Sequence, residues 1–170
     1  MRSRILFVAI LTISFLACAC GTQDSRSEEA EASEALLVHS KAKDVTHSEV
    51  KGTFQVRYSV GEKYPGDKLI DWLANELNRK GWKPLEYDFL DPNIKLSHVT
   101  GWTNFIDSRK PVEYQVHQWL ANWKHASGSV VRYQLRYQYP KTSQPDLSTV
   151  EVSAVSIPAR LVKEAEKFPK

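Results

Sequence analysis

The segment VEYQVHQWLANWKHASGSVVRYQLRYQY, residues 112–139, contains two stretches of alternating apolar and polar residues on either side of a short polar turn. This alternation predicts two long antiparallel strands, 112–125 and 130–139, that form a hairpin. Ala126-Ser127-Gly128 fits a three-residue loop in which Gly128 takes the left-handed conformation. The hairpin is therefore the expected centre of a β-sheet.

The loop length also predicts which residues lie opposite one another. With three loop residues, His125 opposes Ser129. Counting back from there, the opposed pairs are Trp123 with Val131, Ala121 with Tyr133, and Trp119 with Leu135. One face of the hairpin is then apolar, and the other carries Gln118, Asn122, Lys124, Arg132, Gln134 and Arg136. A two- or four-residue loop would shift the pairing by one and place both tryptophans over arginines as an exposed cation–π ladder. We favour the first register because it keeps the apolar side chains together.

Residues 68–80 predict the main helix. Leu69, Ile70, Leu73 and Leu77 recur at intervals of three and four, which places them on one stripe of a helix. Basic residues at the end of the stretch suit the helix dipole, and Gly81 is the expected C-terminal cap.

Shorter patterns complete the predicted fold. Strands are expected over 53–60, 82–88, 98–107 and 149–157, and a short helix over 158–168. The order predicts an α+β fold with one main helix packed on an antiparallel sheet of about five or six strands, strand-helix-strand and then a meander. We expect residues 51–170 to form this single domain.

The N-terminus has the pattern of an export signal. Arg2 and Arg4 precede an uncharged apolar stretch, 5–17, which has the length of a signal-peptide core and is too short to span a bilayer. The small residues 17–21 follow, and they resemble the lipobox of bacterial lipoproteins. Cleavage before Cys18 or before Cys20 fits the resemblance, which makes residues 1–19 the signal peptide. An ordinary secretory signal, cut after Ala19 and leaving Cys20 unmodified, is the alternative.

The lipoprotein resemblance implies a fatty-acylated cysteine, Cys18 or Cys20, and a membrane-anchored protein that faces the periplasm. The following residue is Ala19 or Gly21 rather than Asp. By resemblance to enterobacterial lipoproteins, this favours the outer membrane. Both cysteines of the chain lie here, so the folded domain is expected to contain no disulfide and no thiolate metal site.

Residues 20–50 are predicted to be a flexible acidic leash. From Gly21 to Val50 there are seven acidic and three basic residues, and the segment is rich in Ser, Glu and Ala. Such a composition buries too little apolar surface to offset its ordering entropy, although 28–38 has helix-forming residues. About 25 flexible residues would span roughly 25–30 Å on average. From Lys51 onward there are 18 basic and 13 acidic residues but no basic run, so we expect no nucleic-acid partner.

Aromatic residues are the most prominent feature of the expected domain. The set consists of Trp72, Trp82, Trp102, Trp119, Trp123, Tyr133, Tyr137 and Tyr139. Core and sheet packing is the preferred interpretation, because each ring buries a large area. A glycan-stacking surface is the alternative, with Trp102 between Gly101 and Thr103 as its most exposed member.

Histidines and loop carboxylates offer the remaining candidates. His117 lies two residues from Trp119 and so shares its face; with His98 and Trp102 it forms the candidate binding surface. No histidine pair has metal-binding spacing, so no metal is expected. Asp107 or Glu113 with His98 or His117 could form the acid/base pair of a hydrolase acting on an envelope polymer. No nucleophile or phosphate-loop motif occurs, and no catalytic residue or cofactor is assigned.

Segments 97–102, 116–119 and 135–137 resemble small uncharacterised proteobacterial envelope proteins, a resemblance that implies no functional residue. The leading hypothesis is a non-enzymatic, lipid-anchored envelope protein that binds a protein partner or a cell-wall component. The hydrolase and the glycan binder are the alternatives.

Mass spectrometry of the native protein tests the anchor. The expected mass lacks the residues before Cys18 or Cys20 and includes fatty acyl groups on the new N-terminal cysteine. An intact Met1, or a trimmed terminus without a fatty acid, would contradict it.

Overall fold

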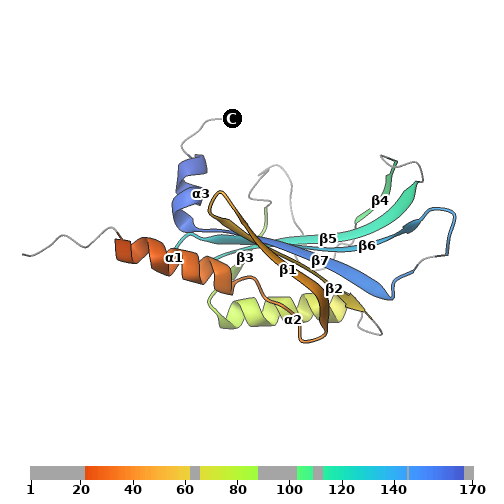
Figure 1. Ribbon diagram of the computed structural model, residues 1–170, viewed down its shortest axis with the longest axis horizontal. Coiled ribbons are helices and arrows are strands. Elements are labelled where there is room, and N and C mark those ends of the chain that lie inside the picture. Colours follow the sequence, from red (N-terminus) through yellow and green to blue (C-terminus); the bar gives the residue numbers. More distant parts are fainter. Residues whose placement is uncertain (1–21, 62–65, 88–102, 109–112, 145, 167–170) are drawn as a thin grey trace, which may run out of the picture.

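The computed structural model describes residues 22–61, 66–87, 103–108, 113–144 and 146–166 (Figure 1). Their elements are α1 (Thr22–Glu34), β1 (Ala42–Val50), β2 (Thr53–Gly61), α2 (Gly66–Arg79), β3 (Lys83–Leu85), β4 (Thr103–Asp107), β5 (Tyr114–Lys124), β6 (Val130–Pro140), β7 (Thr149–Ile157) and α3 (Ala159–Glu166). The strands form one antiparallel sheet in the order β1-β2-β7-β6-β5-β3, and β4 also pairs with β5.

The α+β class and the antiparallel sheet are confirmed, but the finer prediction of one main helix is not. The described residues contain three helices and seven strands rather than five or six. β3 is shorter than the predicted strand 82–88 and pairs with 122–124, whereas β4 pairs with 114–118. These two short strands therefore share the outer edge of β5. The first part of the predicted strand 98–107 lies outside the described residues.

The hairpin register is confirmed residue by residue. Trp123 pairs with Val131, Ala121 with Tyr133, and Trp119 with Leu135. Gly128 has a φ of 105°, which is the left-handed conformation, and its N–H donates to the His125 carbonyl at 3.0 Å. The exposed cation–π ladder is thereby excluded, since Trp119 and Trp123 are buried.

Helix α2 covers the apolar face of the sheet and lies beneath it in Figure 1. Its predicted stripe is buried in one core cluster with the apolar residues of β2, β5, β6 and β7. Gly81 has a φ of 85°, and the Trp82 N–H donates to the Leu77 carbonyl at 3.0 Å, which closes the helix as predicted. Trp82 is also buried, so core packing is the correct interpretation for three of the five tryptophans.

The prediction of a flexible leash over residues 20–50 is wrong for the described residues 22–50, which contain α1 and β1. β1 is an edge strand whose side chains are nearly all exposed, so it lacks the apolar alternation that marks a half-buried strand. Backbone pairing with β2 holds it instead, through the turn Lys51-Gly52, in which both residues have positive φ.

Two buried phenols hold the segment between α1 and β1. The Tyr133 hydroxyl donates to the Ala35 carbonyl at 2.7 Å and accepts from the Leu37 N–H at 2.6 Å. The Tyr58 hydroxyl donates to the Leu37 carbonyl at 3.1 Å. Burial raises the pKa of both phenols above 10.0, so they remain protonated donors at neutral pH. These contacts tie the backbone after α1 to the sheet, in addition to the local bond from the Leu37 N–H to the Ala35 carbonyl at 3.0 Å.

Removing one hydroxyl tests this attachment. Tyr133→Phe removes the phenol hydrogen bonds of the Ala35 carbonyl and the Leu37 N–H, which then keep only their bond to each other at 3.0 Å, so the free energy of unfolding is expected to fall by about 1–2 kcal/mol in urea titrations. Tyr87→Phe is the matched control, because Tyr87 is exposed. Equal stability of the two variants would contradict the assigned role.

Candidate functional site

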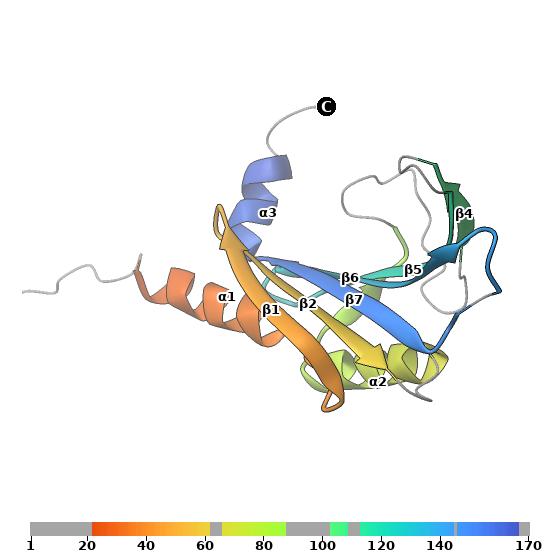
Figure 2. The same cartoon turned by 45° about the vertical axis from the view of Figure 1, so that its right-hand side comes forward.

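Helix α2 lies on one side of the sheet (Figure 2), and the face that turns away from it carries polar side chains. Side chains alternate between the two faces of a strand, so the residues between the buried ones point to this side. The register places them in rows that cross the strands. One row contains Ser59, Glu151, Arg136 and Gln118 on β2, β7, β6 and β5. The next row contains Arg57, Ser153 and Gln134 on β2, β7 and β6.

A groove of about 510 Å³ lies over these rows. Its polar lining residues are Asp44, Arg57, Ser59, Gln134, Arg136, Glu151 and Ser153, and Tyr58 and Val152 complete it. The ring of Tyr58 belongs to the core on the other face, so the lining presents no aromatic platform for stacking. The volume is in the range of small-ligand sites, and the lining suits a polar ligand.

Hydrogen bonds order one side of the groove floor. The Gln134 amide donates to the Gln118 side-chain oxygen at 2.7 Å, and the Ser153 hydroxyl donates to Gln134 at 3.5 Å. Arg136 pairs across the sheet with Glu151 on β7, but its guanidinium contacts the buried Asp107 on β4 instead. The Nη2 atom of Arg136 and the Oδ2 atom of Asp107 are 3.4 Å apart. The Nε of Arg136 is buried and has no hydrogen-bond partner among the described residues.

Two charged groups on the groove floor remain uncompensated. Within the described part of the chain, neither the guanidinium of Arg57 nor the carboxylate of Glu151 has a hydrogen bond or an ion pair. Both side chains are exposed. Arg57 pairs with Ser153 and Glu151 pairs with Ser59, so the charges occupy one diagonal of a square and the hydroxyls occupy the other. Arg57 and Glu151 are therefore a cation and an anion at diagonal positions of neighbouring strands, about 7–8 Å apart, and no described residue forms an ion pair with either.

The candidate binding surface of the sequence analysis does not coincide with this groove. His98 and Trp102, like Cys18 and Cys20, lie outside the described residues. His117 is half-buried, and its Nε2 lies 2.7 Å from the hydroxyl of Tyr139. It thus belongs to a tyrosine contact at the edge of the core.

The two carboxylates that were candidates for hydrolysis, Asp107 and Glu113, each contact a different basic side chain. Asp107 faces Arg136, whereas Glu113 accepts from Lys141 at 2.8 Å and from Ser108 at 3.3 Å. The hydrogen bond from Lys141, its charge and the Ser108 hydroxyl lower the pKa of Glu113. A general acid needs the opposite shift. Among the described residues, His117 contacts Tyr139, whereas Asp107 and Glu113 face Arg136 and Lys141, so the structure does not bring these side chains together as an acid/base pair.

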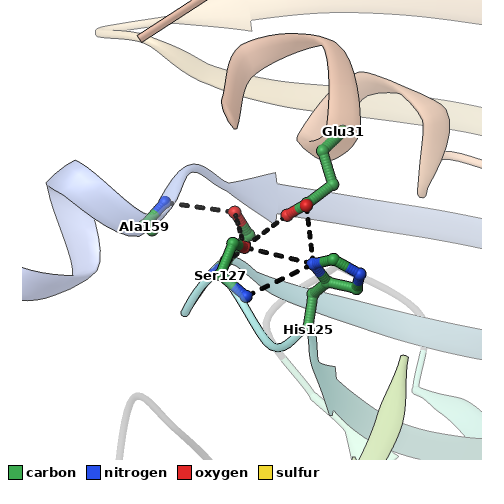
Figure 3. A network of polar contacts seen from close by, with 5 residues as sticks. Glu31, His125, Ser127 and Ala159 are labelled. Atoms are coloured by element: carbon green, nitrogen blue, oxygen red, sulfur yellow. Dashed lines mark hydrogen bonds and ion pairs between the residues drawn. The ribbon is translucent and has the colours of Figure 1, made fainter. Parts of the chain in front are cut away.

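A second polar cluster joins α1, the hairpin tip and α3 (Figure 3). The Glu31 carboxylate lies 2.6 Å from Nδ1 of His125 and accepts from the Ser127 hydroxyl. The Ser127 oxygen in turn accepts from the Ser129 N–H at 3.2 Å. The Ser129 hydroxyl accepts from the Ala159 N–H at the start of α3.

This cluster contains Ser, His and Glu, but its connectivity differs from that of a catalytic triad. In a triad the serine donates to one imidazole nitrogen while the carboxylate holds the other. Here Ser127 donates to the carboxylate itself, and both Glu31 and Ser127 approach the same nitrogen, Nδ1. The opposite nitrogen, Nε2, lies beside Gly81. The connectivity of a catalytic triad is therefore not formed here, and the cluster acts as a structural joint between α1, the hairpin tip and α3.

The same joint fixes α1 to α3. Glu28 accepts from the Arg160 N–H at 3.1 Å, where a carboxylate suits the positive end of the α3 dipole. Glu29 pairs with the Arg160 guanidinium at 2.8 Å. The acidic residues that favoured a leash in the sequence are thus the groups that dock α1.

Metal sites, membrane-spanning helices and similarity to known proteins give no further indication of function. Across the described residues, no group of three or more His, Cys, Asp or Glu side chains is placed to hold a metal ion. No helix in the described ranges is long and apolar enough to cross a membrane. Comparisons with protein-family models, curated proteins and solved structures found no match to this chain.

Sequence reasoning placed Gln134 and Arg136 on the polar face of the hairpin, as the structure does. It missed the groove because Arg57, Glu151 and Asp44 come from strands whose neighbours the sequence does not specify. The alternation in 53–60 and 149–157 was a usable signal, since it points these polar side chains away from the core.

The joint is tested by Glu31→Gln, which removes the carboxylate that accepts from His125 and Ser127. Because the pair is partly exposed, the free energy of unfolding is expected to fall by about 1 kcal/mol, with faster amide exchange in α1. Glu34→Gln is the matched control on the same helix, since its side chain is exposed. A loss of similar size in both variants would refute the joint.

Proposed function

We propose that this protein is a lipid-anchored component of a bacterial cell envelope whose domain binds a small polar envelope ligand, without catalysing a reaction. The anchor would be a fatty acid on Cys18 or Cys20, and the protein would face the periplasm from the outer membrane. The export signal and the small residues around the cysteines support this address.

The groove over the polar rows is the observation that supports binding. Stable protein–protein contacts bury roughly 800 Å² on each partner, usually around apolar or aromatic anchors. The groove is a local hollow of about 510 Å³ lined mainly by polar and charged residues, and the ring of Tyr58 packs in the core. It suits a small ligand such as a cell-wall fragment better than a protein partner. This favours the cell-wall branch of the hypothesis.

The contacts of Asp107 and Glu113 favour binding over hydrolysis. Each carboxylate faces a basic side chain, which stabilises its charged form. A glycan site built on Trp102 has no supporting observation among the described residues.

Cosedimentation with purified peptidoglycan sacculi tests the proposal. The full chain in detergent is expected to sediment with sacculi, and Ser153→Trp should reduce the bound fraction at least tenfold because the indole fills the groove. Asn75→Trp places the same side chain on the exposed face of α2 and should bind like the wild type. Circular dichroism confirms that both variants are folded.

Binding that is absent in the wild type, or unaffected by Ser153→Trp in a folded protein, would overturn the proposed site.

A further inference from the structure

The charge pattern of the groove specifies its ligand more closely. We infer that the groove binds a small zwitterion of the amino-acid type, a free amino acid or short peptide whose carboxylate contacts Arg57 and whose ammonium contacts Glu151. This inference rests on the proposed function and names the chemistry of the ligand.

The charges of Arg57 and Glu151 have no partner among the described residues. Arg57 and Glu151 occupy diagonal positions on neighbouring strands and could each pair with an opposite charge nearby. Arg136, the cation directly opposite Glu151, is drawn to Asp107 instead. Arg57 faces the short hydroxyl side chain of Ser153. Each charge is therefore available to a ligand, and a guanidinium can hold a carboxylate through two parallel hydrogen bonds.

The neighbouring groups complement a peptide between these charges. Ser59 and Ser153, on the second diagonal of the square, donate to Asp44 and Gln134 at 3.5 Å, so their oxygens can accept from a peptide N–H. Arg136 also lines the groove with its side chain partly exposed, so it offers a further donor to an amide or carboxylate oxygen of the ligand.

Other ligand classes fit this lining less well. A lipid tail or a nucleobase would leave Arg57 and Glu151 without partners, and the one aromatic residue of the lining, Tyr58, packs its ring in the core. A polyanion is disfavoured because Asp44 and Glu151 offset the two arginines. A peptide with both termini free carries one charge of each sign and matches the groove.

Calorimetric titration of the full chain in detergent tests the inference with four probes. These are trialanine with free termini, its N-acetylated form, its C-terminal amide, and free alanine. Trialanine is expected to bind, and each blocked form should bind at least tenfold more weakly, since each loses one charge-assisted contact. Free alanine distinguishes an amino-acid site from a peptide site, because both charges are present without the amide.

Two variants assign the contacts. In Arg57→Gln, trialanine and its C-terminal amide should bind alike, while N-acetylation still weakens binding. In Glu151→Gln, the acetylated and free peptides should bind alike. Arg79→Gln and Glu164→Gln remove the same charges at exposed sites on α2 and α3 and should preserve the wild-type pattern.

Blocked peptides that bind as tightly as trialanine, or no heat with trialanine or alanine at millimolar concentration, would overturn the inference. If sacculi still sediment the protein through the groove in that case, the proposed binding function stands and only the ligand class fails. If sacculi also fail, both fail.

Discussion

The register of the β5–β6 pairing determines which side chains lie on the apolar face of the sheet and which lie on the polar face. A β-strand presents successive side chains to opposite sides, so a slip of one residue would exchange the two faces completely. The three-residue turn with Gly128 at φ 105° sets that register. It directs Trp119, Tyr133 and their neighbours toward α2. It also directs Gln134 and Arg136 to the open side, and without it neither the core nor the groove would exist.

Sequence patterns were sufficient to predict those elements whose contacting residues lie within one continuous stretch of the chain. The hairpin 112–139 and the helix with its cap at Gly81 could be predicted because periodicity, turn chemistry and burial all agree. The strand at 149–157 was also predicted with its observed bounds. The sequence alone does not specify that β7 lies between β2 and β6, and this order places Glu151 beside Ser59.

The N-terminal segment shows why composition was misleading. Seven acidic residues between Gly21 and Val50 suggested a solvated chain, because charge usually opposes burial. In the structure, Glu28, Glu29 and Glu31 find specific partners on α3 and on the hairpin tip. The phenols of Tyr58 and Tyr133 then bind the backbone that follows. Such long-range pairing depends on the completed sheet, and no local pattern reports it.

The docking of α1 also alters the geometry expected of an acylated chain. In a protein acylated at Cys20, Gly21 alone precedes the first residue of α1, and a Cys18 anchor adds Ala19 and Cys20. An extended residue advances the chain by about 3.5 Å, so in such a protein a few peptide units would take the place of a tether of roughly 25–30 Å. The domain would then lie close to the bilayer surface and adopt a restricted set of orientations. The distance that the domain extends from the membrane would then depend on the size of the folded domain rather than on the fluctuations of a flexible chain.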